Sequence, residues 1–442
     1  MKVSFVSLGC DKNLCDTEHM MSLLAKDGHV FVPEPEDAEI CVINTCCFIA
    51  DALEESINTI IEIGKLKETG SLKVLVIAGC LGQRFTDEVL SDLPEVDGIV
   101  GTNSYDEVVK VIHQALEGKK EVLKKDFTSL PKNEGRFLSN VVPYTYLKIA
   151  EGCDKHCTYC IIPSIRGNYR SIPMEEILSE AKDLAAKGIK ELNLVAQEVT
   201  VYGIDLYGKN SLPLLLEKLS EIEGIEWIRL LYCYPEEIDD DLIRCMEQNP
   251  KVCHYIDMPI QHCNDEILGR MGRKTSKADI MDKINLLRKH MPDIAIRSTL
   301  ICGFPGETQE NHKELLSFVS DMKFDRLGAF SYSKEDGTPA ATFDHQIEDE
   351  TKDAWRDEIM ALQQEISLSK NKEMVGKIVS CFVEGKLEDG VYVGRTYRDA
   401  PDVDGYIFIE SDKEFLSGDM ISVKVTGYKE YDLIGDYYEF AE

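Results

Sequence analysis

The chain has 442 residues and a formal net charge of −31, with 80 Asp or Glu against 49 Lys or Arg. This length suits about three domains, and so large an acidic excess disfavours non-specific binding to nucleic acid. There is no run of 18 apolar residues and no secretory signal in the opening MKVSFVSLGCDKN, so we expect neither a membrane span nor secretion. Fifteen cysteines in such a chain indicate the reducing cytoplasm, where thiols bind metals or pack in cores.

Residues 1–120 alternate short apolar runs with helical patterns. Buried strands are predicted at Val3–Leu8, Ile40–Asn44, Lys73–Ala78 and Gly98–Gly101. The apolar spacing in Ala52–Lys65 predicts a helix between two of them. This alternation predicts an α/β domain with a parallel sheet, and the polar stretch Lys124–Gly135 that follows predicts a linker.

The same alternation returns in longer units over residues 139–372. Strands are predicted at Tyr146–Ala150, Glu191–Ala196, Trp227–Leu231, His254–Met258, Ala295–Cys302 and Arg326–Tyr332. A helix is predicted to begin at Pro173 and to end at Gly188. Six such units predict a partial (βα)6 barrel, in which the chemistry lies where the strands end and the loops begin.

The pattern changes in the last part of the chain. A charged segment, Asp349–Glu373, predicts a helix. Residues 374–442 then show five short alternating runs: IVSCFVEG, GVYVGRTY, GYIFI, MISVKVTGY and IGDYYEF. Short strands separated by turn residues predict a small OB-like β-barrel.

Cys153, Cys157 and Cys160 form the spacing CxxxCxxC. Three thiolates without an obvious fourth ligand favour a 4Fe-4S cluster with one open iron, the type that binds and cleaves S-adenosylmethionine (SAM). Structural zinc sites close with four ligands, and His156 within the loop keeps that alternative open. Three unrelated buried thiols are disfavoured by the polar neighbours Asp154 and Lys155.

Three further cysteines each follow a predicted strand of the first domain: Cys10, Cys46 and Cys80. The carboxyl ends of parallel strands share one edge of a sheet, so these thiols can converge on one centre. The alternative is that they pack in the core as small apolar residues. Alternation of side chains along the strand favours Cys46 over its neighbour Cys47 as the ligand.

A SAM pocket is predicted from residues at strand ends of the second domain and from the cluster loop. Tyr159 lies beside Cys160 and offers a ring to the adenine, while Gln197 ends a strand. Arg297 offers a planar partner for the SAM carboxylate, and Gly303 allows close backbone approach. For each of these residues the alternative is a turn position or a satisfied polar group in the core.

The motifs SLGCDKNLCDTE, VINTC, AGC and CDKHCTYCIIPSIRG together resemble the methylthiotransferases of the radical SAM superfamily. The resemblance covers essentially the whole chain and includes a terminal barrel similar to the TRAM domain. It implies two 4Fe-4S clusters, held by Cys10, Cys46 and Cys80 and by Cys153, Cys157 and Cys160. It also implies SAM as methyl donor and radical source, and a low-potential electron donor such as flavodoxin.

The terminal segment bears on the substrate. Residues 374–442 contain 7 Lys or Arg against 15 Asp or Glu, a net charge of −8, whereas a barrel that grips tRNA is expected to be basic. The stretch GRTYRDAPDVDGYIFI is similar to the RimO branch of the family, which modifies the β-carbon of an aspartate of ribosomal protein S12.

We therefore expect a protein substrate, with Asp399, Asp402 and Asp404 as candidates for the contact face. The alternative for these three is a solvated turn. Two alternative functions are a tRNA methylthiotransferase of the MiaB type and a non-catalytic iron–sulfur carrier, which would need exposed clusters and no SAM pocket.

Overall fold

The computed structural model describes residues 1–140 and 142–439. These residues divide into two compact units. Unit 1 contains residues 1–141, 150–172 and 333–341, and unit 2 contains residues 142–149, 173–332 and 342–442. Unit 1 thus takes in residues 150–172, which carry CxxxCxxC, together with the N-terminal sheet.

Unit 1 is built on a parallel sheet with the strand order β2-β1-β3-β4-β5-β6. Its strands are β1 (Lys2–Ser7), β2 (Val30–Phe31), β3 (Ile40–Thr45), β4 (Val74–Gly79), β5 (Gly98–Val100) and β6 (Glu121–Leu123). The α-helices between them are α1 (Asp11–Lys26), α2 (Ala50–Gly64), α3 (Leu66–Thr69), α4 (Cys80–Arg84), α5 (Thr86–Asp92) and α6 (Val108–Leu116). The predicted parallel sheet is confirmed.

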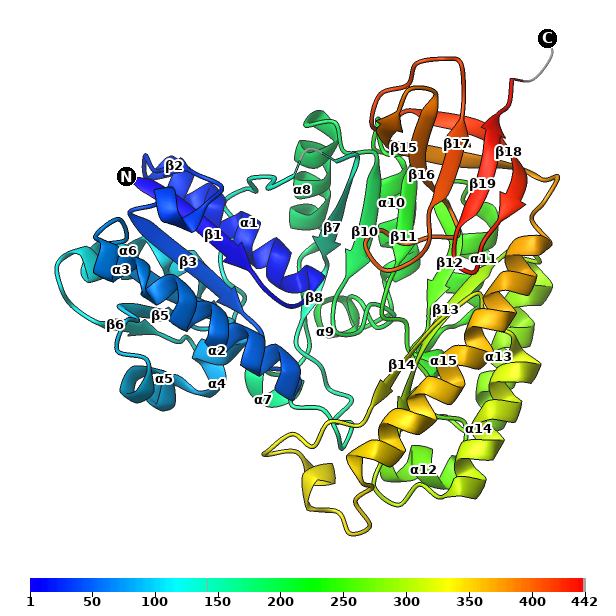
Figure 1. The fold of residues 1–442 in the computed structure, drawn as a ribbon, viewed down its shortest axis with the longest axis horizontal. Helices are drawn as coiled ribbons and strands as arrows, with labels where there is room; N and C mark the ends of the chain where they lie inside the picture. Colours follow the sequence, from blue (N-terminus) through cyan, green and yellow to red (C-terminus); the bar gives the residue numbers. More distant parts are fainter. Residues whose placement is uncertain (141, 440–442) are drawn as a thin grey trace. The chain divides into compact units, whose positions relative to one another are not determined.

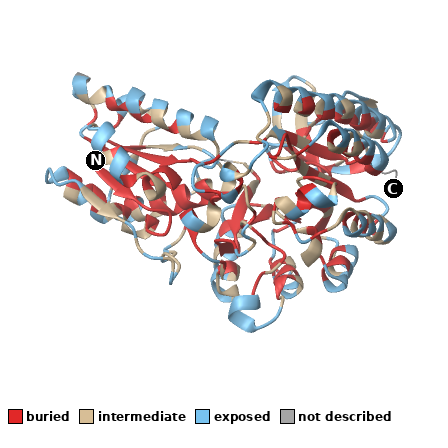
Figure 2. Ribbon diagram, turned by 90° about the horizontal axis from the view of Figure 1, so that it is seen from below, coloured by how far each residue is buried: buried red, intermediate tan, exposed pale blue. Residues whose placement is uncertain are grey.

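The central strands β3 and β4 are buried along their whole length, as Figure 2 shows by their red colour. Alternate residues pack into two apolar clusters, one containing Ile43 and Ile77 and the other containing Val42 and Val76. A strand covered on both faces reads as a continuous apolar run rather than an alternating one, which is why these strands were predictable from sequence. Their carboxyl ends are thereby fixed by packing on both sides.

The cysteine loop of unit 1 lies between two short strands that pair antiparallel, β8 (Ala150–Glu151) and β9 (Arg170–Ser171). One short helix, α7 (Ile162–Arg166), follows the last cysteine of the loop. The predicted strand Tyr146–Ala150 is therefore split, because β7 ends at Lys148 and Ala150 begins β8.

Unit 2 contains an open parallel sheet with the strand order β14-β13-β12-β11-β10-β7. Its strands are β7 (Tyr144–Lys148), β10 (Glu191–Val195), β11 (Trp227–Leu230), β12 (Val252–Asp257), β13 (Ala295–Cys302) and β14 (Arg326–Ser331). The α-helices are α8 (Met174–Ala186), α9 (Ile204–Tyr207), α10 (Leu212–Ser220), α11 (Asp240–Gln248), α12 (Asp265–Arg270), α13 (Lys277–His290), α14 (Gln309–Met322) and α15 (Asp349–Lys372). The predicted partial barrel is confirmed.

The chain closes with a barrel in the order β15-β16-β17-β19-β18. Its strands are β15 (Ile378–Glu388), β16 (Val391–Thr396), β17 (Ile407–Glu410), β18 (Met420–Tyr428) and β19 (Leu433–Tyr437). Inward residues such as Val383, Ile409 and Val423 fill its core. The predicted OB-like barrel is confirmed, and residue 440 at the end of the last predicted strand lies outside the described residues.

Within the described residues, no helix combines the length and the apolar character that crossing a membrane requires.

Candidate functional site

Three cysteines lie at the carboxyl ends of neighbouring strands in the unit 1 sheet. Cys10 follows β1 and caps the start of α1, Cys46 directly follows β3, and Cys80 directly follows β4. Cys46 and Cys80 are buried, and Cys10 is half-buried. Burial raises the pKa of the Cys80 thiol most, and the nearby thiols of Cys10, Cys46 and Cys47 raise it further, so these thiols lie in one region. The structure thus brings together the three cysteines that the strand ends predicted.

A glycine in the left-handed region precedes Cys10, Cys80 and Cys153. Gly79 has φ +87°, and a Cβ there would lie 2.3 Å from Asn44 Oδ1. Gly152 has φ +81°, and a Cβ there would lie 2.1 Å from the Asn168 carbonyl oxygen. Any other residue at these two positions would be strained by the positive φ, and its Cβ would clash with the neighbouring atoms. The repeated Gly-Cys pair therefore lets a strand end abruptly and turn its cysteine out of the strand direction.

Asn13 on α1 ties two of the strand ends together. Its Nδ2 donates to the carbonyl of Leu8 at 2.8 Å and to the carbonyl of Thr45 at 3.0 Å. Thr45 is the last residue of β3 and precedes Cys46, while Leu8 follows β1. Asn13 is buried and so is its bond to Thr45, a carbonyl that water does not reach, while its bond to Leu8 is partly buried. One side chain thus fixes the spacing between two cysteine-bearing segments.

Arg166, the last residue of α7, extends to the same edge of the sheet. Its guanidinium donates to Asn13 Oδ1 at 2.6 Å and lies 3.8 Å from the sulfur of Cys80. It also forms ion pairs with Glu151 at 2.9 Å and Asp16 at 3.4 Å. The side chain is 1% exposed. A buried cation therefore stands beside the thiols.

The electrostatics of this edge suit an anionic metal cluster. Burial raises the pKa of Cys46 and of Cys80 above the ordinary thiol value, and Arg166 opposes that rise on both. Thiols bind iron as thiolates, and a guanidinium at this distance offsets part of their charge. Three converging sulfur donors with a neighbouring cation fit a 4Fe-4S cluster.

Cys47 lies in a different environment from Cys46. It is fully buried in the apolar cluster that contains Ile43 and Ile77, and its carbonyl accepts a bond from Arg84 at 3.1 Å. Burial raises its pKa to about 12. By contrast, a Cβ on Gly9 would lie 3.0 Å from the Cys46 sulfur, which places that sulfur beside the Cys10 segment. The position of the Cys46 sulfur beside the Cys10 segment favours Cys46, and its role as the ligand stays a prediction.

The second group of cysteines lies in one loop. Cys153 and Cys157 are buried, and Cys160 is half-buried. The Cys160 amide donates to the Cys157 carbonyl at 3.0 Å, and the Lys155 amide donates to the Cys153 sulfur at 3.5 Å. Burial raises the pKa of Cys160 to about 12, with further rises from Cys157 and Cys153. The charges of Cys157 and Cys153 both act on Cys160, so the three thiols of this loop lie near one another, which fits a second cluster.

Two of the predicted SAM-contacting residues lie where the sequence placed them. Tyr159 is half-buried in the cysteine loop of unit 1. Gln197 is half-buried just beyond the end of β10 in unit 2. Their role toward SAM stays a prediction.

Arg297 and Gly303 have structural partners that the sequence did not reveal. The Arg297 guanidinium bonds Asp257 at 2.9 Å and lies 3.6 Å from Asp404, so two carboxylates already match its charge. This arrangement argues against the predicted bond to the SAM carboxylate. Gly303 has φ +75°, and a Cβ there would lie 2.2 Å from Lys352 Cγ. Packing against Lys352 on α15, rather than ligand approach, accounts for this glycine.

The expected contact face of Asp399, Asp402 and Asp404 is wrong for two of its three members. Asp399 is 2% exposed and pairs with Arg326 and Thr396. The Asp404 side chain is also 2% exposed and accepts a bond from Tyr255 at 2.7 Å. Asp402 is exposed and accepts bonds from Tyr144 and Tyr146, each at 3.0 Å.

The loop after β16 therefore packs on the core sheet of unit 2. Its partners stand near the first residues of core strands: Tyr144 begins β7 and Arg326 begins β14. Burial raises the pKa of Asp404 most and the neighbouring Asp399 raises it further, while Arg297 and Arg326 lower it in part. The turn-rich sequence predicts solvated or partner-binding aspartates, but two of them pair with core cations distant in the chain: Asp399 with Arg326, 73 residues away, and Asp404 with Arg297, 107 residues away.

The sequence pattern did not predict the roles of Arg166 and Asn13, although these residues lie within the motifs CIIPSIRG and CDKN. A charged residue in an apolar stretch next to a cysteine motif was the available signal. Asp16 and Glu151, which pair with Arg166, carried no such signal because each stands among ordinary helix or strand residues.

Comparisons with known proteins agree with this architecture. Residues 2–101 match the model described as Uncharacterized protein family UPF0004, residues 147–319 match the Radical SAM superfamily, and residues 375–437 match the TRAM domain.

Among solved structures, the radical SAM methyltransferase TsrM from Kitasatospora setae has a TM-score of 0.56 at 12% identity, over 86% of this chain and 77% of that one. The radical SAM enzyme OxsB has a TM-score of 0.51 at 14% identity, over 83% of this chain and 56% of that one. At such identities the likeness shows the fold alone.

Curated relatives are far more similar. The ribosomal protein uS12 methylthiotransferase RimO of Lachnoclostridium phytofermentans is 53% identical over 98% of this chain and 99% of that protein. The RimO of Clostridioides difficile is 45% identical over the full length of both chains, and that of Acetivibrio thermocellus is 49% identical over 98% of each. With its cysteine triads and terminal barrel in place, the chain belongs to the RimO family of radical SAM methylthiotransferases.

Proposed function

We propose that this protein adds a methylthio group to the β-carbon of an aspartate of ribosomal protein uS12. The enzyme class follows from the family, whose members use two 4Fe-4S clusters and SAM. The observation that supports this function best is the presence of two cysteine triads in one compact unit. A carrier of a single exchangeable cluster needs neither a second triad nor the buried cation beside it.

Each triad is assigned one cluster. Cys10, Cys46 and Cys80 hold the auxiliary cluster, and Cys153, Cys157 and Cys160 hold the cluster that binds SAM. When bound, these groups supply the radical and sulfur-transfer chemistry of the reaction. The chain itself fixes the sulfur donors: Asn13 joins two of the auxiliary segments, and Gly79 and Gly152 set the turns before Cys80 and Cys153.

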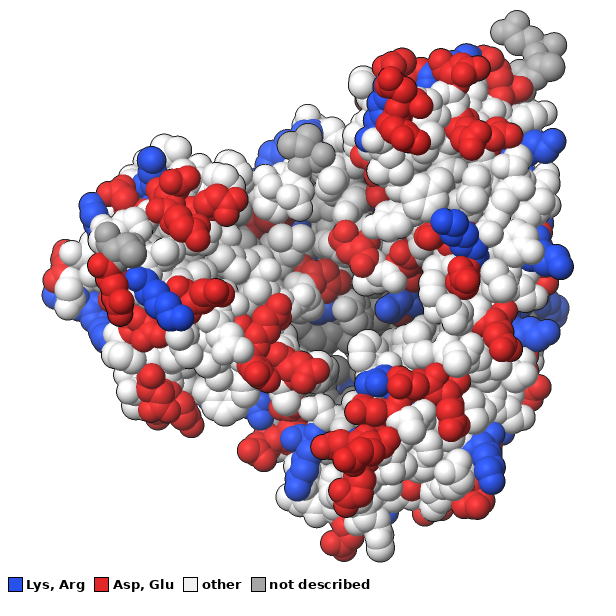
Figure 3. Space-filling view, in the orientation of Figure 1, with Lys and Arg blue, Asp and Glu red and all other residues white. Residues whose placement is uncertain are grey.

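The surface of the terminal barrel supports a basic protein substrate. Figure 3 shows acidic side chains gathered on this barrel, at the upper right of the view. Exposed carboxylates lie at the β15–β16 turn and after β17, and the Ser411 amide joins these two segments by donating to Gly390. We name this set the acidic edge: Glu388, Asp389, Glu410, Asp412 and Glu414.

The acidic edge lies at the opposite ends of β16 and β17 from the loop that packs on the core. Asp389 precedes β16 whereas Asp399 follows it. Ribosomal proteins are typically basic, so complementary charge speeds and orients their encounter with this edge. The same carboxylates repel the phosphates of tRNA. The acidic edge replaces Asp399 and Asp404 as the proposed contact face, and the exposed Asp402, at the other end of β16, remains a separate candidate.

Mass spectrometry of the product tests the assignment of substrate. The anaerobically reconstituted enzyme, given SAM, a sulfur source and a low-potential reductant, is incubated with uS12 or with tRNA from a strain lacking this gene. We expect one methylthio group on an aspartate of uS12 and none on adenosine. Methylthiolated tRNA without modified uS12 would show the MiaB-type activity, and absence of SAM cleavage would favour the iron–sulfur carrier.

Charge reversal tests the acidic edge. The variant Asp389→Lys, Asp412→Lys, Glu414→Lys should raise the KM for uS12 several-fold with little change in kcat, because these residues are exposed and far along the barrel from the packed loop. Added salt should shrink the difference. The control variant Glu217→Lys, Glu223→Lys, Glu226→Lys carries the same charge change on exposed residues of the core. Equal KM values for the two variants would remove the acidic edge from the model.

The remaining assignments follow from this function. We propose a low-potential electron donor such as flavodoxin as a partner, a cytoplasmic location, and a role for Tyr159 and Gln197 beside SAM. We also propose a functional division into residues 1–120 with the auxiliary triad, residues 139–372 with the radical SAM core, and residues 374–442 with the substrate-binding barrel.

A further inference from the structure

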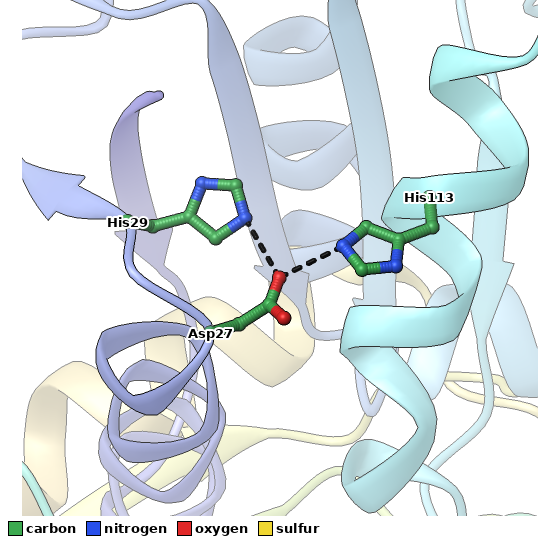
Figure 4. A group of neighbouring side chains, drawn as sticks. All are labelled: Asp27, His29 and His113. Carbon is green, nitrogen blue, oxygen red and sulfur yellow. Dashed lines mark hydrogen bonds and ion pairs between the residues drawn. The ribbon is translucent and has the colours of Figure 1, made fainter.

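A second kind of metal-ligand cluster lies in unit 1, formed by Asp27, His29 and His113. Figure 4 shows the two imidazoles pointing at one carboxylate from opposite sides. Asp27 Oδ2 lies 3.2 Å from His29 Nε2 and 2.8 Å from His113 Nε2. The potential ligand atoms of the three residues all lie within 4.8 Å of one another. Among the described residues, no other group of three His, Cys, Asp or Glu meets this criterion.

Local structure holds two of these residues in place. Helix α1 ends at Lys26, Asp27 caps it, and Gly28 takes a φ of +85°. The Gly28 amide donates to Ala25 and the His29 amide donates to Leu24, which is the bonding of a Schellman ending. The turn thereby presents Asp27 and His29 on the same side. His113 comes from the last turn of α6, so the cluster joins two separate helices of the unit.

We propose that this cluster binds a zinc ion. Two imidazole nitrogens and one carboxylate oxygen are a donor set that zinc favours, with a fourth position left for water. Ligands at zinc bond lengths lie roughly 3.4 Å apart in a tetrahedron, close to the present spacing. The His29 side chain is 6% exposed, and its Nδ1 has no hydrogen-bond partner among the described residues. His113 is 52% exposed, which leaves an entry path.

The ion would connect the end of α1 with α6, outside the two cysteine triads. The alternative is a hydrogen-bonded group in which both imidazoles donate to Asp27 and no metal binds. The two can be separated by metal content, because hydrogen bonds alone retain no zinc.

The test uses the full-length enzyme with both iron clusters loaded, so that the cluster cysteines are occupied. After dialysis against buffered zinc, we expect one zinc per chain in the wild type and none in His113→Ala, with equal iron in both. The control is His254→Ala, which removes a half-buried histidine that pairs with a single carboxylate, Asp293, at 2.7 Å. It should keep its zinc.

X-ray absorption at the zinc edge gives a second readout. Nitrogen and oxygen ligation without sulfur supports the site, and sulfur ligation would assign the zinc to cysteines and overturn it. Equal zinc in the wild type and in His113→Ala would also overturn it. Bound zinc should raise the Tm of the wild type but not that of His113→Ala, because a ligand that binds only the folded state stabilises it.

A separate observation concerns Arg166, and this second inference rests on the proposed function. Arg166 ends the helix that leaves the SAM-type cysteine loop, yet its guanidinium lies 3.8 Å from the sulfur of Cys80 in the other triad. Its charge also acts on Cys46 and Cys10. Arg166 therefore follows the triad of Cys153, Cys157 and Cys160 in sequence but contacts Cys80 of the other triad.

We infer that Arg166 is a positioning residue that sets the reduction potential of the auxiliary cluster. A cluster gains negative charge on reduction, so a buried cation beside it favours the reduced form and raises the potential. Removal of Arg166 would also leave Glu151 and Asp16 buried without their cation, which lowers the potential further.

The potential can be measured in a variant that lacks Cys153, Cys157 and Cys160, where only the auxiliary cluster gives an electron paramagnetic resonance signal. In that background, Arg166→Gln should shift the midpoint potential to a more negative value. Arg166→Lys keeps the positive charge, so its midpoint potential should stay close to that of the background variant. Arg136→Gln is the matched control: Arg136 is equally buried in unit 1 but pairs with Glu18. It should leave the potential unchanged.

The possible outcomes distinguish a failure of the proposed role of Arg166 from a failure of the proposed function. An unchanged potential in Arg166→Gln, or a shift of the same size in Arg136→Gln, would overturn the role of Arg166. If Arg166→Gln lost its iron, Glu151→Gln would be measured instead, because it keeps Arg166 and removes a buried negative charge paired with it. The midpoint should then shift to a more positive value, and an unchanged midpoint would overturn the role of Arg166. Absence of iron in the background variant itself would instead count against the auxiliary triad and hence against the proposed function.

Discussion

The two cysteine triads are each brought together in unit 1, but by different structural features. Cys153, Cys157 and Cys160 lie in one loop, so a few neighbouring turns are enough to gather them. Cys10, Cys46 and Cys80 come from three strands, and only the packed sheet brings them together. The loop triad therefore depends on local geometry, whereas the strand-end triad depends on the whole fold of unit 1.

Removal of a whole triad has the largest expected effect. We expect about eight irons per chain after anaerobic reconstitution of the wild type, and about four in each triple alanine variant. Loss of Cys153, Cys157 and Cys160 should abolish SAM cleavage. Loss of Cys10, Cys46 and Cys80 should keep SAM cleavage and end thiomethylation. Full iron content in the second variant would show that the strand ends hold no cluster.

Substitution of the glycine before a cysteine is expected to affect the two triads differently. Gly79→Ala and Gly152→Ala each force a left-handed residue and a Cβ contact shorter than 2.5 Å, at a cost of about 1–3 kcal/mol. Gly152→Ala should lose the SAM-type cluster and keep the other. Gly79→Ala should lose the auxiliary cluster and also lower the free energy of unfolding of unit 1, because it disturbs two strand ends.

Iron content, SAM cleavage and urea unfolding measure these effects. Gly118→Ala is the control, since Gly118 has φ +79° but nothing within 4 Å of the added Cβ. A loss of iron in Gly118→Ala equal to that in Gly79→Ala would show that the close contact at Asn44 is irrelevant.

Asn13 has no counterpart in the loop triad. Asn13→Ala leaves the carbonyls of Leu8 and Thr45 without their donor and should cost about 1–3 kcal/mol of stability. We expect weaker retention of the auxiliary cluster during gel filtration, with the SAM-type cluster unaffected. Asn13→Asp keeps an acceptor for Arg166 but loses the donors, so it should behave like Asn13→Ala. Iron retention equal to the wild type in Asn13→Asp would contradict the tie between the strand ends.

The smallest effect is expected at Cys47. Cys47→Ala removes a buried sulfur from an apolar cluster and should cost about 1 kcal/mol while both clusters remain. Cys46→Ala should lose the auxiliary cluster. Iron analysis of the two single variants, with urea unfolding in parallel, shows which of the two adjacent cysteines is the cluster ligand. The reverse pattern of iron loss would reassign the ligand.

Much of the fold was predictable because its strands carry strong local signals. Ile40–Thr45 and Val74–Gly79 are continuous apolar runs, and their ends fell within a residue or two of the prediction. The cysteine positions followed from these ends. The partners of Arg297 and Asp404 could not be predicted, because their pairing depends on how the terminal barrel packs against the core sheet. The cluster of His29 with His113 likewise joins residues 84 positions apart.

The packed loop after β16 has a consequence for the modularity of the protein. Barrels of this kind look exchangeable in sequence, and a gene fusion that swaps residues 374–442 would seem a simple way to change the substrate. Here Asp399 and Asp404 are partners of Arg326, Tyr255 and Arg297 in the core. A transplanted barrel without these aspartates would leave the buried Arg326 and the half-buried Arg297 without their carboxylate partners in the barrel. Successful chimeras should therefore carry the loop of the host with them, grafting only the far end of the barrel.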